Sequence, residues 1–114
     1  MLLVALSIAA GCTRRDPAAE HAALAARGRE IFTRRCGPCH GPEADWPIET
    51  RLKGRTVDEF VALFDHLPAV NPIMPSFDDA PAADHRAVAV YLVSLEHAAG
   101  APAAPGRPPG DSRR

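Results

Sequence analysis

The chain has 114 residues, a formal net charge of −1 and an apolar content of 46%. That length allows one small domain, and the near-zero charge, with only one Trp, one Tyr and four Phe, argues against a nucleic-acid binder, which needs a basic surface and stacking rings. No apolar run reaches the roughly 18 residues of a membrane span. Because a domain of this size buries little apolar area, we expect a disulfide, a metal or a cofactor to stabilise it.

Residues 1–11 are mostly apolar and have the pattern of a secretory signal peptide. The run IAAGC at positions 8–12 resembles the cleavage box of bacterial lipoproteins, in which the cysteine becomes the lipid-bearing first residue. The alternative is ordinary signal cleavage that leaves Cys12 without a role, but a free thiol in an oxidising compartment favours a dedicated use. We therefore expect export to the periplasm, with residues 12–22 as a tether and Cys12 as a lipid anchor.

The first predicted helix runs to about Arg35. Apolar or small residues recur with helical spacing on one face, which predicts a buried stripe: Leu24, Gly28, Ile31 and Phe32. The rest of its surface is rich in arginine: Arg27, Arg29, Arg34 and Arg35.

Two further helices are predicted. Thr56 and Glu59 have the spacing of a capping box, which starts a helix that ends before Pro68. Its apolar stripe consists of Val57, Phe60, Val61 and Phe64. The last helix begins near residues 79–81 and ends by Gly100, with a stripe of Val88, Tyr91, Leu92 and Leu95.

No comparable strand pattern is present, so the sequence predicts an all-α domain at residues 23–97, with three main helices. Long, proline-rich loops at 41–55 and 67–80 connect them, and such loops count against a compact fold unless something inside holds them. Residues 98–114 contain four Pro and three Gly and are predicted to form a disordered Pro/Ala/Gly-rich tail.

The strongest motif is Cys36-Gly37-Pro38-Cys39-His40, since C-x-x-C-H is the attachment signature of c-type haem. Each of the two thiols can add across one vinyl group of the porphyrin, and the adjacent histidine then reaches the iron from the same side. One covalently attached haem c is therefore the predicted cofactor, with Cys36 and Cys39 holding the ring and His40 binding the iron.

Other chemistries use the same residues. Cys-Gly-Pro-Cys is also the dithiol of thioredoxin-like thiol-disulfide oxidoreductases, in which a lowered pKa makes the first cysteine a nucleophile. That motif follows a strand and opens a helix, whereas a helical pattern precedes Cys36 here. A zinc site needs a second pair of ligands, and the remaining histidines are scattered singly. A plain disulfide is the last alternative.

Met74 is the predicted sixth ligand of the iron. Apart from Met1 it is the only methionine, and it lies 34 residues beyond His40 in a loop stiffened by Pro72 and Pro75. The alternative role of a methionine is to fill a gap in the core. His66 and His85 are the other candidate ligands, but we expect both to be solvated surface residues.

The joint pattern resembles a class I cytochrome c of the bacterial type. It consists of Gly28-x-x-x-Phe32-x-x-x-Cys36-x-x-Cys39-His40, then Met74-Pro75, then Tyr91-Leu92 in the last helix. The resemblance implies an all-α fold around one haem, axial ligation by His40 and Met74, and single-electron transfer. It also implies that the first and last helices cross where Gly28 and Phe32 meet Tyr91 and Leu92.

Two further expectations concern the surroundings of the haem. A ligating imidazole normally donates its other N–H to a carbonyl, and the resemblance makes Pro47 or Pro42 a candidate acceptor for His40. The side chains predicted as donors to the haem propionates are Trp46, Lys53 and Arg55.

The predicted function is therefore that of a monomeric electron-transfer protein, not itself an enzyme, that exchanges electrons with a redox donor and a redox acceptor. The alternative is a haem sensor or an accessory subunit of an oxidoreductase whose methionine yields to a ligand. Residues 56–84 contain six acids and no Lys or Arg, a polarity that could steer a basic partner: Asp58, Glu59, Asp65, Asp78, Asp79 and Asp84. Ordinary solvation of the helix faces explains the same acids equally well.

Overall fold

The structure, a computed structural model, describes residue 11 and residues 14–100. The predicted lipid anchor Cys12, nearly all of the predicted signal peptide and most of the predicted tail lie outside the described residues.

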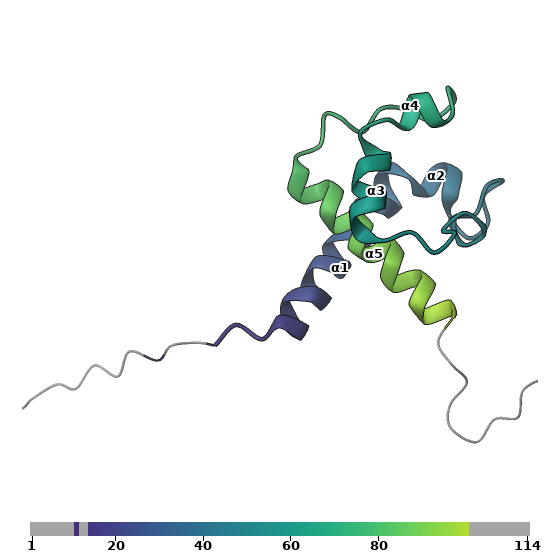
Figure 1. Cartoon of the computed structure of the whole chain (residues 1–114). Coiled ribbons are helices and arrows are strands. Elements are labelled where there is room, and N and C mark those ends of the chain that lie inside the picture. The colour runs from purple at the N-terminus through teal and green to yellow at the C-terminus, as the bar shows by residue number, and fades with distance from the viewer. Residues whose placement is uncertain (1–10, 12–13, 101–114) are drawn as a thin grey trace, which may run out of the picture.

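The described part of the chain is entirely helical where it is regular (Figure 1). Its elements are α1 (Pro17–Arg35), α2 (Gly37–His40), the 3-10 turn η1 (Ile48–Thr50), α3 (Val57–Phe64), α4 (Leu67–Val70) and α5 (Ala82–Ala99). Residues 11 and 14–100 contain no strand, which confirms the predicted all-α class. None of the helices in these residues is long and apolar enough to cross a membrane.

Helix α1 begins earlier than the sequence pattern suggested. The Asp16 side chain accepts a hydrogen bond from the Ala18 N–H (3.1 Å), and Pro17 occupies the first turn, where its missing N–H costs nothing. Residues 17–22, which we assigned to the tether, are therefore helical, although all of them are exposed.

Helices α1 and α5 cross closely in the centre of the molecule (Figure 1). Gly28 makes the crossing possible, since a Cβ at this position would overlap the backbone of Ala87 and lie 2.8 Å from the Cβ of Tyr91. The Phe32 and Tyr91 rings pack with their centroids 5.5 Å apart. The crossing that the resemblance implied is thus confirmed at these residues.

Helix α3 packs against α5 and is capped as predicted. The Thr56 hydroxyl accepts from the Glu59 N–H (3.2 Å), and Phe60 and Phe64 are buried. The helix ends at Phe64, and a short helix that the sequence analysis did not anticipate, α4, follows with Pro68 in its first turn, a position where proline is tolerated.

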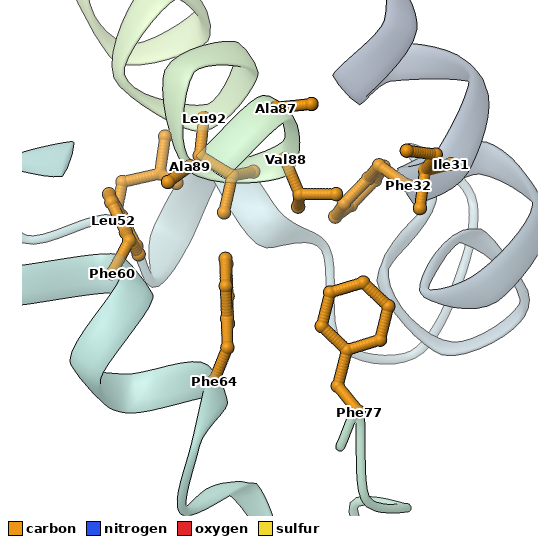
Figure 2. Packing of buried hydrophobic residues seen from close by; sticks show 10 residues of the cluster. All are labelled: Ile31, Phe32, Leu52, Phe60, Phe64, Phe77, Ala87, Val88, Ala89 and Leu92. Carbon is orange, nitrogen blue, oxygen red and sulfur yellow. The ribbon is translucent and has the colours of Figure 1, made fainter. Parts of the chain in front are cut away.

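The core lies between α1, α3 and α5, and the two long loops each contribute one buried residue to it (Figure 2). Those residues are Leu52 and Phe77, which are 3% and 4% exposed. The Phe77 ring lies edge-on to Phe64 with centroids 5.8 Å apart. The second loop is therefore held to the helices by an aromatic contact close to Met74.

Two ion pairs connect α1 to the C-terminal part of the domain. Arg27 donates twice to one carboxylate oxygen of Asp84 (2.8 and 3.2 Å), and Arg35 donates to both oxygens of Asp79 (2.7 and 3.0 Å). The Arg35–Asp79 pair is bidentate, which fixes direction as well as distance.

Candidate functional site

The Cys-x-x-Cys-His motif forms a separate helical turn directly after α1. The Cys36 N–H bonds to Phe32 O (2.8 Å) and ends α1, and Cys36 O then accepts from the Cys39 and His40 N–H groups (3.2 and 2.8 Å). Residues three and four apart share one side of a helix. The local fold therefore brings both thiols and the imidazole to one side of a single turn.

The two cysteines differ in their surroundings. Cys36 is half-buried against the hydrophobic core, whereas Cys39 is exposed. Burial raises the pKa of the Cys36 thiol to about 11. A nucleophilic cysteine of the thioredoxin type requires a shift in the opposite direction.

The His40 ring is oriented by the loop that follows it. Its Nδ1 lies 2.6 Å from the carbonyl oxygen of Trp46, and because a carbonyl only accepts, Nδ1 carries the hydrogen. The lone pair is then on Nε2, the nitrogen free to bind a metal. The predicted acceptors Pro47 and Pro42 are wrong: the acceptor is the carbonyl of Trp46, one residue before Pro47.

Met74 lies in a loop whose shape is fixed locally. The Asn71 side chain accepts from the Ile73 N–H, and the Asn71 carbonyl accepts from the Met74 N–H, each over 3.0 Å. Met74 itself is half-buried, while neighbouring Ile73 is 75% exposed.

The prediction that His85 is a solvated surface residue is wrong, because the structure buries it. It is 6% exposed, its Nε2 lies 2.8 Å from Phe77 O, and its ring stacks on Phe77. The prediction failed because the loop after Met74 folds over the first turns of α5. His66, by contrast, is exposed, as expected.

The loops around the motif and Met74 expose large apolar side chains. Trp46, Val70 and Ile73 are 43%, 55% and 75% exposed, and they are the exposed large hydrophobic residues of the described chain. A flat apolar ring beside the motif would shield such side chains from water. Together with the two thiols and the Nε2 of His40, they fit a covalently bound haem.

The predicted propionate donors have different surroundings. Trp46 is partly exposed, and Lys53 occupies a left-handed conformation (φ 55°) in a turn with Gly54. Arg55 donates from Nη1 to Arg51 O (3.1 Å) and Leu52 O (3.5 Å). The Arg55 guanidinium is thus directed at its own loop. Contact of Trp46, Lys53 and Arg55 with haem propionates stays a prediction.

The family model described as cytochrome c oxidase, cbb3-type, subunit III matches residues 23–92. The chain belongs to this family of c-type cytochrome domains. The matched region contains most of α1, all of α2 to α4, the Cys-x-x-Cys-His motif, Met74 and most of α5. Neither the comparison with curated proteins nor the comparison with solved structures gives a match.

Membership of the cytochrome c family implies a covalently bound c-type haem and a role in electron transfer. The competing interpretations lose support on separate grounds. Residues 11 and 14–100 lack the strands of a thioredoxin-like fold, and they contain no group of three or more His, Cys, Asp and Glu side chains that could hold a metal ion.

Four of the six acidic side chains of residues 56–84 have basic neighbours in the folded cytochrome. Asp79 and Asp84 pair with arginines of α1, Asp58 lies 3.7 Å from Arg86, and Asp65 lies 3.4 Å from Nδ1 of His85. Because paired carboxylates present less net charge to a distant partner, this arrangement weakens the case for charge steering.

Proposed function

We propose that this cytochrome is a single-electron carrier with one haem, bonded to Cys36 and Cys39, whose iron is held between His40 and Met74. The observation that carries the proposal is the hydrogen bond from His40 Nδ1 to Trp46 O (2.6 Å), because it leaves Nε2 as the basic nitrogen on an imidazole beside two thiols. The sequence contains one Cys-x-x-Cys-His motif, which supports a single haem.

Met74 is the best candidate for the second axial ligand. It is the only methionine besides Met1, and thioether ligation combined with histidine raises the reduction potential relative to two histidines. The competing ligand His85 already bonds to Phe77 O through Nε2, and its other nitrogen faces Asp65. Neither nitrogen of His85 is therefore available.

The haem would supply a one-electron couple, and the residues of this chain fix and insulate it. The Trp46 carbonyl orients His40, while the prolines around Met74 restrict the movement of that loop. The core helices behind Cys36 exclude water from one side, which limits rearrangement when the charge on the iron changes.

A haem stain and carbon monoxide test this proposal. Haem should stay on the wild-type chain in a denaturing gel and be lost in C36S/C39S. Ferrous wild type should bind carbon monoxide poorly, whereas M74A should bind it readily because the sixth position opens. I73A, a change at the exposed neighbour, should behave as wild type. An M74A protein that binds carbon monoxide no faster than wild type would refute the ligand assignment.

The same experiment separates a carrier from a sensor or an accessory subunit with a labile methionine. In that second function, ferrous wild type would itself bind carbon monoxide readily. The Asn71 hydrogen bonds and the two prolines beside Met74 restrict this loop and favour the carrier.

We propose further that the protein is exported and anchored by a lipid on Cys12. The support is the apolar run at 1–11 and the IAAGC pattern at 8–12. Fractionation of cells that express wild type and C12S tests both steps: wild type should be found with the membranes, and C12S should be soluble in the periplasm. Wild-type protein in the soluble fraction would refute the lipid anchor, and protein found in the cytoplasm would refute export.

A further inference from the structure

Resting on the proposed His/Met ligation, we propose that His85 is the positioning residue of the axial methionine. Through its hydrogen bond to Phe77 O, the imidazole holds the segment after Met74 against α5 and so keeps the thioether on the iron. Phe77 is only three residues beyond Met74, whereas His85 lies in a different element.

The contact between His85 and Phe77 involves both backbone and ring. His85 Nε2 lies 2.8 Å from Phe77 O, and the two rings stack with centroids 4.5 Å apart and an interplanar angle of 13°. Phe64 of α3 also packs against the imidazole, edge-on with centroids 6.1 Å apart. At 6% exposure, this bond is shielded from competition by water, which makes its loss costly.

The hydrogen bonds that residues 69–74 donate are all local. Residues 69–71 bond to residues 66 and 67, and Ile73 and Met74 bond to Asn71. Phe77 O also accepts from the Ala80 N–H (3.1 Å), which again lies within the loop. Among the described residues, the bond from His85 is therefore the hydrogen bond that connects this carbonyl to a helix.

A second contact links the same segment to the haem-attachment motif. The Arg35 guanidinium lies 5.0 Å from the centroid of the Phe77 ring and pairs with both oxygens of Asp79. Arg35 directly precedes Cys36. The Phe77 ring thus contacts Arg35 of α1 and His85 of α5. The segment after Met74 is therefore held against both helices that support the site.

Phe77 O only accepts, so Nε2 carries the hydrogen of this bond. The charged groups around the ring are Asp65, which directly follows α3 and whose Oδ1 lies 3.4 Å from Nδ1, Asp79 from the loop, and Arg35 beyond Phe77. His85 therefore acts as a fixed donor to the loop.

Variants at His85 in the haem-loaded protein test the proposal. H85F keeps an aromatic ring but loses the donor, and H85Q keeps an N–H donor of similar reach. H97F, at an exposed histidine of the same helix, is the control. The readouts are the weak far-red absorption band of methionine bound to ferric iron, the rate of carbon monoxide binding to the ferrous form, and hydrogen exchange of the Met74 amide.

We expect H85F to weaken the far-red band, to bind carbon monoxide at least about tenfold faster, equivalent to about 1.4 kcal/mol, and to exchange the Met74 amide faster. H85Q should recover most of each change, and H97F should match wild type. An H85F protein within about twofold of wild type in carbon monoxide binding, or an H85Q protein as impaired as H85F, would overturn the proposal.

If H85F accumulates no haem-loaded protein, H85Q and H85N carry the test, because both have an amide but only Gln is long enough to reach Phe77 O. Better methionine binding in H85Q than in H85N supports the proposal, and equal binding refutes it. Failure of the ligation itself is distinguishable, since wild type would then lack the far-red band. In that case M74A would change nothing.

Discussion

Gly28 of α1 lies directly against the backbone carbonyl of Ala87 in α5, with no room for a side chain between the two helices. An alanine inside a helix normally adds about 0.5–1 kcal/mol of stability relative to glycine. Here the new methyl group would meet backbone atoms, which cannot rotate away, and overpacking of this kind costs about 1–3 kcal/mol. The steric cost is larger than the gain in helix propensity, so the substitution should lower stability.

We therefore expect G28A to lower the free energy of unfolding of the haem-loaded protein, measured by urea denaturation. A26S, at an exposed position of the same helix, is the control and should change stability by less than about 0.5 kcal/mol. Equal stability of G28A and wild type would mean that α1 and α5 do not approach as closely as the structure shows.

The start of α3 gives a second stability test. The Thr56 hydroxyl accepts from the Glu59 N–H (3.2 Å), and loss of such a cap costs about 1 kcal/mol. T56A should lower the urea midpoint accordingly, while T56S, which keeps the hydroxyl, should stay close to wild type. If T56S were as destabilised as T56A, packing of the threonine methyl group would explain the effect instead.

The pairing of Arg35 with Asp79 predicts a dependence of stability on pH. The hydrogen bond from Arg35 lowers the pKa of Asp79 below its ordinary value of 3.8. A carboxyl group with a lowered folded pKa stabilises the protein above its unfolded pKa and loses this effect as the pH falls through the folded pKa. The extra stability of wild type over D79N should therefore be present at about pH 6 and shrink below about pH 4.

Urea unfolding of wild type and D79N across this range checks the prediction. D78N is the matched control, because the neighbouring Asp78 carboxylate makes no ion pair with the described residues. A difference between wild type and D79N that stayed constant with pH would show that Asp79 acts through packing and not through its charge.

Local signals explain what the sequence predicted well. The cap at Thr56, the stripe from Gly28 to Phe32 and the Cys-x-x-Cys-His turn each depend on residues within about one or two helical turns. These features set the helices and the first half of the candidate site, and the structure reproduces them.

The missed features depend on contacts between distant segments. Arg35 and Asp79 are 44 residues apart, and the burial of His85 requires the Phe77 loop to fold over α5. One signal was nevertheless present: His85 precedes Val88 and Leu92 by three and seven residues, which places it on the buried stripe of the last helix. The Trp46 carbonyl carries no side-chain signal, since any residue before Pro47 supplies the same group.

That carbonyl leads to the final prediction, which concerns the reduction potential. With His40 as the proposed iron ligand, a hydrogen bond from Nδ1 would make the ring a stronger electron donor and so stabilise the ferric state. Pro47 narrows the range of backbone conformations open to Trp46, whose carbonyl accepts this bond. In P47A this restriction is lost and the bond, 2.6 Å long in the native protein, should weaken.

The midpoint potential of P47A should therefore rise, by about 20–65 mV if the bond contributes the usual 0.5–1.5 kcal/mol to a one-electron couple. Redox titration of the purified proteins measures this shift. P42A, in the same loop but before the Trp46 turn, serves as the control and should keep the wild-type potential. Because a weaker donor ligand favours ferrous iron, an unchanged or lowered potential in P47A would contradict the assignment of Trp46 as the residue that orients His40.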